Sequence, residues 1–92
     1  MFRFDLHIHS TLSDGDKSPA EIILMAVKNK VKLLSITDHD IISEKEDISA
    51  ILKNHSLKFI HGAEINCRHK SLSLEILGYY IDPAEKKLSA KL

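Results

Sequence analysis

Apolar and polar residues alternate over the first nine positions of the chain, which is the pattern of a β-strand with two different faces. Because successive side chains of a strand point to opposite faces, Asp5, His7 and His9 share one face of a predicted strand over Phe2–His9. Two imidazoles side by side at the end of a strand can bind one divalent ion. A polar turn follows, and its carboxylate, Asp14, could come back toward that ion.

Helix signals and further strand patterns then alternate along the chain. The run Ser18–Glu21 is a capping box with proline at the first helical position, and it predicts a helix that ends near Asn29–Lys30. A second capping-box pattern, Ser43–Glu46, predicts a helix that ends near Asn54. The remaining apolar runs predict strands over Val31–Ile36, Lys58–Ile65 and Ser71–Ile81, with a last helix from Asp82.

The predicted order is therefore β-α-β-α-β-β-α. Strands joined by helices usually run parallel, with right-handed crossovers. This order predicts an α/β fold, either an open layer or part of a β/α barrel. No repeat beyond the βα alternation and no linker is present, so residues 1–92 are expected to form a single domain.

Composition and charge narrow the classes of partner. Thirteen basic and thirteen acidic side chains cancel, so nothing predicts attraction to a nucleic-acid polymer. The sequence shows no apolar run long enough to span a membrane and no signal peptide, so no membrane partner is expected. The single cysteine fits a reducing compartment, and the cytoplasm is the expected location.

Residues typical of metal ligands recur at the predicted carboxyl ends of strands, where functional groups gather in α/β folds. His7 and His9 close the first strand. The run Thr37–Asp40, with its histidine, closes the second strand, and Glu64 closes the third. With Asp14 from the first turn, these groups form a mixed nitrogen and oxygen donor set, which suits Zn, Mn or Fe better than Ca or Mg alone.

Each of these residues also has a structural interpretation. Asp38 and Asp40 are as typical of turns and helix caps as of metal sites, and Asp14 before a glycine is typical of a plain turn. Glu64 is also compatible with a solvated strand end. The remaining histidines and the cysteine show no strand-end pattern and are expected to be surface or packing residues; they are His55, His61, His69 and Cys67.

Four segments of the chain resemble the PHP family, the polymerase-and-histidinol-phosphatase domains. They are Asp5–Ser10 with Ser13–Gly15, Ile36–Asp40, Gly62–Ile65 and Ile76–Tyr79. The resemblance covers essentially the whole chain. It implies that the chain is the N-terminal portion of a distorted, TIM-like β/α barrel, and that the complete protein hydrolyses small phosphate esters, nucleotides among them.

The resemblance also implies a site for two or three divalent ions, Mn, Zn or Fe. His7 and His9 would hold one ion, and Glu64 would bridge that ion to a second. Asp14 and His39 would complete the neighbouring site.

Two features depart from the family pattern. The family usually has a histidine ligand two residues before its Leu-Gly-Tyr triplet, whereas this chain has Glu75, which would make the site harder and more anionic. Family members also continue through later strands that supply further ligands. The chain is therefore expected to be either the N-terminal part of a phosphoesterase or a truncated module that binds metal or self-associates without catalysis.

An incomplete barrel leaves an open strand edge and an uncovered sheet face. We expect apolar side chains such as Leu34 and Ile36 to be exposed on that face. The expected partners are therefore a phosphate-ester substrate and either further copies of the chain or a missing C-terminal segment.

Overall fold

The computed structural model describes residues 3–43, 45–53 and 55–82. The helix predicted from Asp82 falls on residues 83–92 and lies outside the described residues, as does Glu44 of the second capping-box pattern. Within the described part of the chain, no helix is long and apolar enough to cross a bilayer.

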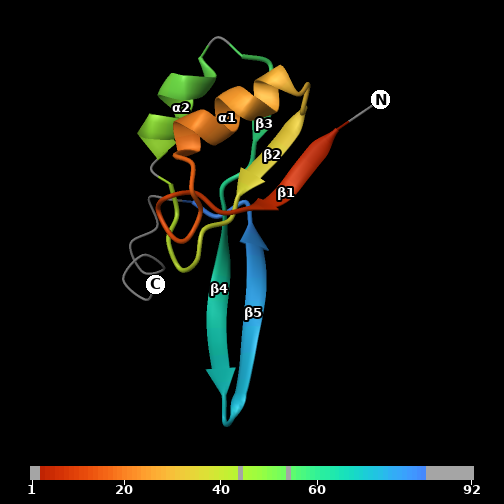
Figure 1. The fold of residues 1–92 in the computed structure, drawn as a ribbon. Helices are drawn as coiled ribbons and strands as arrows, with labels where there is room; N and C mark the ends of the chain where they lie inside the picture. The colour runs from red at the N-terminus through yellow and green to blue at the C-terminus, as the bar shows by residue number, and fades with distance from the viewer. Residues whose placement is uncertain (1–2, 44, 54, 83–92) are drawn as a thin grey trace.

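Three parallel strands form the main sheet. β1 (Phe4–Ile8), β2 (Leu33–Ile36) and β3 (Lys58–Phe59) lie in the order β1-β2-β3. Figure 1 shows the two helices, α1 (Pro19–Lys28) and α2 (Lys45–Leu52), packed side by side against this sheet. The predicted α/β class and the parallel direction of these strands are confirmed.

The hydrophobic core lies between the helices and β2. Ile23 of α1 and Leu34 of β2 are fully buried, and Ile36 and Ile48 join them in one cluster. The expectation that Leu34 and Ile36 would be exposed is therefore wrong. The helices cover the sheet face that carries these two residues, and by alternation Ser35 points to the opposite face.

The start of α1 follows the predicted capping box. The Ser18 hydroxyl accepts a hydrogen bond from the Glu21 amide at 3.2 Å, and the Glu21 carboxylate accepts one from the Ser18 amide at 3.1 Å. The second capping box is not confirmed, because the buried Ser43 hydroxyl has no hydrogen-bond partner among the described residues.

The predicted third strand, Lys58–Ile65, is divided between two sheets in the structure. β3 ends at Phe59, and a new strand, β4 (Gly62–His69), pairs antiparallel with β5 (Leu72–Tyr79). The chain passes closely at Gly62, where a Cβ would lie 2.7 Å from the Ser35 hydroxyl. Over the described residues the order is therefore β-α-β-α-β-β-β.

The β4–β5 hairpin projects away from the rest of the fold (Figure 1). Its root is tied to β1 by the Tyr79 hydroxyl, which donates to the Leu6 carbonyl at 2.6 Å. Three residues on one face of β5 are solvent-exposed, with exposed fractions of 59% for Leu72, 48% for Leu74 and 52% for Ile76. The hairpin therefore has an uncovered apolar face.

Candidate metal centre

Backbone hydrogen bonds extend the parallel arrangement beyond the strand ends to the predicted ligands. The Thr37 amide donates to the Ile8 carbonyl at 2.7 Å, and the Glu64 amide donates to the Asp38 carbonyl at 3.0 Å. His39 and Glu64 then pair in an isolated parallel bridge. The end of β1, the segment after β2 and the start of β4 consequently lie side by side.

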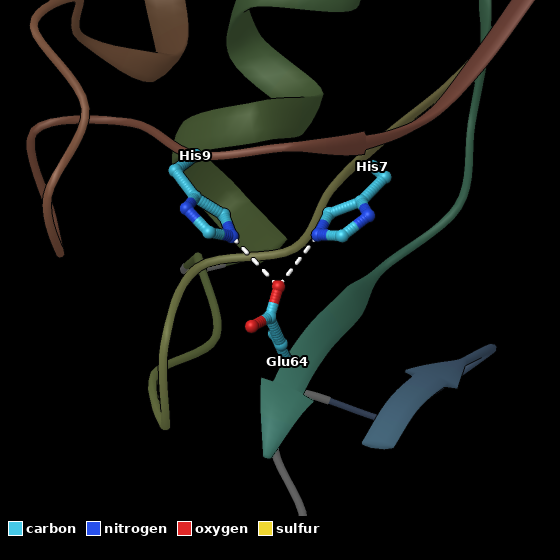
Figure 2. A group of neighbouring side chains, drawn as sticks. All are labelled: His7, His9 and Glu64. Carbon is cyan, nitrogen blue, oxygen red and sulfur yellow. Dashed lines mark hydrogen bonds and ion pairs between the residues drawn. The ribbon is translucent and has the colours of Figure 1, made fainter. Parts of the chain in front are cut away.

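The Glu64 carboxylate is the centre of the site, although its residue is only 2% exposed. Figure 2 shows the rings of His7 and His9 directed at the same Glu64 oxygen, with Nε2 to Oε1 distances of 2.5 and 3.0 Å. The Nδ1 atom of His39 lies 3.5 Å from the second oxygen, Oε2. One donor atom each from His7, His9 and Glu64 lies within 4.8 Å of the others, which is close enough for one ion.

Asp14 brings together a second group of potential ligands. Its Oδ1 atom lies 2.8 Å from Nδ1 of His9, and its Oδ2 atom lies 3.3 Å from Nε2 of His39. The centroids of the two imidazole rings are 4.2 Å apart. The turn after β1 therefore places its carboxylate beside the histidines.

Glu75 reaches the same site from β5. In the hairpin register, Glu64 and Glu75 are diagonal neighbours on one face. The hydrogen bond from Glu75, helped by those from His7 and His9, lowers the pKa of Glu64 to about 2 in spite of burial. The same hydrogen bond and the negative charge of Glu64 raise the pKa of Glu75. The pKa values of the two carboxyl groups are therefore displaced in opposite directions.

Asp38 and Asp40 flank His39, but neither belongs to the two ligand groups. The Asp38 carboxylate accepts hydrogen bonds from Ser10 and Ser13, and the Asp40 carboxylate accepts from the backbone and side-chain nitrogens of Asn66 at 3.0 and 3.2 Å. The sequence did not reveal the hydrogen-bond partners of the two aspartates, because those partners lie 25 to 28 positions away from them in the chain. The one available signal was the presence of hydroxyl residues in the ligand-bearing turn.

The other histidines and the cysteine are outside both groups of described residues. The His61 ring packs edge-on against Phe59 with centroids 5.1 Å apart. These residues are His55, His61, His69 and Cys67.

The donor chemistry of the site fits divalent transition-metal ions. Imidazole nitrogens and carboxylate oxygens together suit Zn, Mn and Fe. The buried Nδ1 atom of His39 has no hydrogen-bond partner in the described part of the chain, and it faces Glu64. A buried carboxylate next to such nitrogens is a favourable environment for a cation.

The chain resembles known proteins in sequence and in fold. It is 36% identical over 92 residues to the 3',5'-nucleoside bisphosphate phosphatase of Chromobacterium violaceum. This match covers 100% of this chain and 32% of that protein. It is 33% identical over 90 residues to a 5'-3' exoribonuclease of Haemophilus influenzae, which is 98% of this chain and 33% of that protein. A solved structure from Bifidobacterium adolescentis, assigned as a metal-dependent phosphoesterase, matches with a TM-score of 0.83 at 25% identity, over 97% of this chain and 31% of that one. The chain thus spans about a third of the length of these relatives.

The segments that carry the site also carry the family signature. A family profile described as the PHP domain matches residues 5–90, a range that includes every candidate ligand from His7 to Glu75. The resemblance expected from the four sequence motifs is confirmed. The chain belongs to the PHP domain family.

Proposed function

We propose that this chain binds divalent metal ions and supplies part of a site that hydrolyses phosphate esters. The observation that carries this proposal is the buried Glu64 carboxylate, whose oxygens lie within 3.5 Å of nitrogens of His7, His9 and His39. Burial of a carboxylate is costly unless charge and hydrogen bonds compensate it, so this cluster suits a cation. The names of the phosphatase and phosphoesterase relatives support the reaction class.

The ring geometry of His9 supports a specific assignment of ligands. A neutral imidazole offers one lone pair for a metal, and its other nitrogen carries a proton. We assign Nε2 of His9, with His7 and Glu64, to a first ion, while Nδ1 of His9 donates to Asp14. The second oxygen of Asp14, together with His39, would then serve a neighbouring ion, and Glu64 would contribute to both ions.

Glu75 is our proposed additional ligand, at the position where the PHP pattern usually has histidine. The pKa of Glu75 is raised by its hydrogen bond with Glu64 and by the negative charge of Glu64, and a cation near both carboxylates would offset that charge. Because an oxygen donor is harder than an imidazole nitrogen, Glu75 should favour Mn or Fe over Zn. Two or three ions in total are part of this proposal.

Divalent ions in such a site supply Lewis-acid activation of the phosphoryl group and of water. The residues of the chain hold the donor atoms in place and exclude water from Glu64. We propose nucleotide phosphate esters as the substrate class. The sequence predicted no nucleic-acid polymer as a partner, but one relative is a 5'-3' exoribonuclease. RNA ends therefore belong among the substrates to be tested.

We also propose that residues 1–92 form one partial domain, the N-terminal portion of a distorted β/α barrel. The parallel order of β1, β2 and β3 supports this, as does the coverage of about a third of each relative. Cys67 is a free cysteine in the structure, in keeping with a reducing compartment, and we propose the cytoplasm as the location.

The proposed activity is tested by phosphate release from a nucleoside 3',5'-bisphosphate and from a 5'-phosphorylated RNA oligonucleotide, with Mn²⁺, Zn²⁺ or Fe²⁺. We expect release that a chelator abolishes and that His7→Ala reduces at least about tenfold, because His7 is a proposed ligand. The control is His55→Ala, since His55 lies outside both ligand groups. Metal binding without any phosphate release would instead favour the truncated, non-catalytic module.

The projecting hairpin supports a self-associating state of the chain. Its apolar face carries the exposed Leu72, Leu74 and Ile76, beside the partly buried cross-strand neighbours Ile65 and Cys67. A two-stranded sheet is marginally stable in water unless another surface covers its apolar face. We propose that a second copy of the chain packs face to face against it, in place of the inner-face association expected from sequence.

Light scattering at micromolar concentration tests this association. The native chain should have the mass of a dimer, and Leu74→Glu should convert it to a monomer because a charge would enter the apolar interface. The matched control is Ser73→Glu, which places the same charge on the opposite face of the same strand. A native chain that is monomeric at this concentration would contradict the proposal.

A further inference from the structure

Asp38 is a buried carboxylate that neither candidate ligand group uses, and it is 1% exposed. One of its oxygens accepts hydrogen bonds from the Ser10 amide at 2.5 Å and from the Ser13 hydroxyl at 2.8 Å. Its other oxygen accepts one from the Ser10 hydroxyl at 2.5 Å. Both oxygens are therefore committed to the turn that follows β1.

These contacts determine the path of that turn. The Ser10 hydroxyl accepts a hydrogen bond from the Leu12 amide at 3.1 Å. The Ser10 carbonyl accepts from the amides of Ser13 and Gly15 at 3.1 and 2.8 Å. A Cβ at Gly15 would overlap the His9 carbonyl, so the turn is packed directly against the backbone that it wraps. The turn thus wraps around Ser10, and Ser10 is hydrogen-bonded to the buried Asp38 carboxylate.

Each ligand of the group around Asp14 is the chain neighbour of a member of this network. The pairs are His9 before Ser10, Asp14 after Ser13, and His39 after Asp38. We infer that Asp38 is a positioning residue that holds Asp14 and His39 in their ion-binding arrangement. This inference rests on the proposed metal-binding function.

The physical reason is that the Asp14 carboxylate itself contacts the imidazoles of His9 and His39 and the Ser13 hydroxyl, so its position depends on the turn that carries it. Its side chain is exposed, and the turn that carries it is tied to the fold through Ser10 and Ser13. The Ser13 hydroxyl lies between the two carboxylates, 2.8 Å from Asp38 and 3.3 Å from Asp14. A side chain that orients a ligand through hydrogen bonds in this way reduces the ordering that ion binding requires.

The side of the cluster formed by His7 and Glu64 serves as an internal control for the role of Asp38. His7 and Glu64 are placed by β1 and β4, without any hydrogen bond from Asp38 to either side chain. Loss of the Asp38 carboxylate should therefore weaken ion binding at the Asp14 and His39 side far more than at the His7 and Glu64 side, which shares only His9 with it.

The test is Co²⁺ binding, followed by calorimetry and by the visible absorption of the bound ion, in two backgrounds. His7→Ala leaves the Asp14 and His39 side, and there Asp38→Asn should weaken Co²⁺ binding about 10- to 100-fold, the usual effect of losing a group that orients a ligand. His39→Ala leaves the His7 and Glu64 side, and there Asp38→Asn should change affinity by less than about threefold, because the Asp38 carboxylate bonds to Ser10 and Ser13 and to neither of these two side chains.

A milder variant covers the case in which Asp38→Asn does not fold. Ser13→Ala removes one hydrogen bond to Asp38 and should weaken binding in the same background only, whereas Ser13→Thr keeps the hydroxyl and should restore it. The matched control is Ser49→Ala on the exposed surface of α2.

Equal weakening in both backgrounds, or none in either, would overturn the positioning role. Absence of Co²⁺ binding by the native chain would refute the proposed function itself. In that event, hydrogen exchange of the metal-free chain still tests whether Asp38 holds the turn that follows β1. Asp38→Asn should remove protection from the amides of Leu12 and Gly15, and retained protection would overturn it.

Discussion

Replacement of Glu64 by glutamine is expected to abolish divalent-ion binding on both sides of the site. Among the described residues, Glu64 is the carboxylate with contacts to all three histidines of the cluster, at 2.5 Å from His7, 3.0 Å from His9 and 3.5 Å from His39. The glutamine has nearly the same volume but no charge, and its amide nitrogen is not a metal ligand. Because loss of an orienting group alone costs about 10- to 100-fold, loss of this shared ligand should cost more than about 100-fold.

Calorimetric titration with Mn²⁺ measures this effect, and the melting temperature with and without Mn²⁺ gives an independent reading, since an ion that binds only the folded chain stabilises it. Asp16→Asn is the matched control, because it removes an exposed carboxylate from the turn that carries Asp14, and Asp16 belongs to neither ligand group. Native-like Mn²⁺ affinity in Glu64→Gln would show that the buried carboxylate has a structural role only.

Replacement of Glu75 by glutamine is expected to have opposite effects on stability and on metal binding. In the metal-free chain, the hydrogen bond with Glu64 and then the negative charge of Glu64 raise the pKa of Glu75. A glutamine amide can donate a hydrogen bond to Glu64 without bearing charge, so Glu75→Gln should raise the melting temperature. It should also weaken Mn²⁺ binding, because it removes a proposed ligand.

The pH dependence of stability separates the two carboxylates. The folded pKa of Glu75 is raised, so the folded chain gains stability as the pH falls from neutral through that pKa. The folded pKa of Glu64 is lowered from 4.5 to about 2, so its contribution is present above pH 4.5 and is lost as the pH falls toward 2. Metal-free Glu75→Gln should lose the first effect and keep the second. Since the histidines are common to both chains, the difference between the two pH profiles of denaturant unfolding reports on Glu75 and on its hydrogen bond with Glu64.

Glu75→His is the matched variant, because it introduces the donor that the PHP pattern usually has at this position. It should shift the preference of the site toward Zn²⁺ relative to Mn²⁺. Identical relative affinities for the two ions in both chains would mean that residue 75 does not contact the ion.

The local features of this protein could be predicted from the sequence because their causes lie within a few residues. The alternation through Asp5, His7 and His9 placed the two histidines on one strand face, and the Ser18–Glu21 run predicted the start of α1. The recurrence of ligand types predicted that His39 and Glu64 would meet at one rim, and the two residues do pair. The predicted reason was wrong for Glu64, because it lies near the start of β4 and not at the carboxyl end of a third parallel strand.

The sequence was ambiguous wherever the outcome depended on residues far apart in the chain. The run Val31–Ile36 is apolar enough to be buried on either face, and only the packing of α1 and α2 decided that Leu34 and Ile36 are covered. The break between β3 and β4 lies next to Gly62, whose backbone passes close to the Ser35 hydroxyl, and no local pattern reveals this long-range contact.

The candidate metal site likewise combines features that the sequence determines locally with contacts that only the tertiary structure sets. The sequence determined which donors this protein possesses and on which strand faces and turns they lie, since side-chain alternation and turn chemistry act locally. The tertiary structure alone decided that Glu75 faces Glu64 and that Asp38 holds the turn before Asp14 instead of acting as a ligand. The reason is that strand register and buried hydrogen bonds between distant segments are set by the packing of the whole fold.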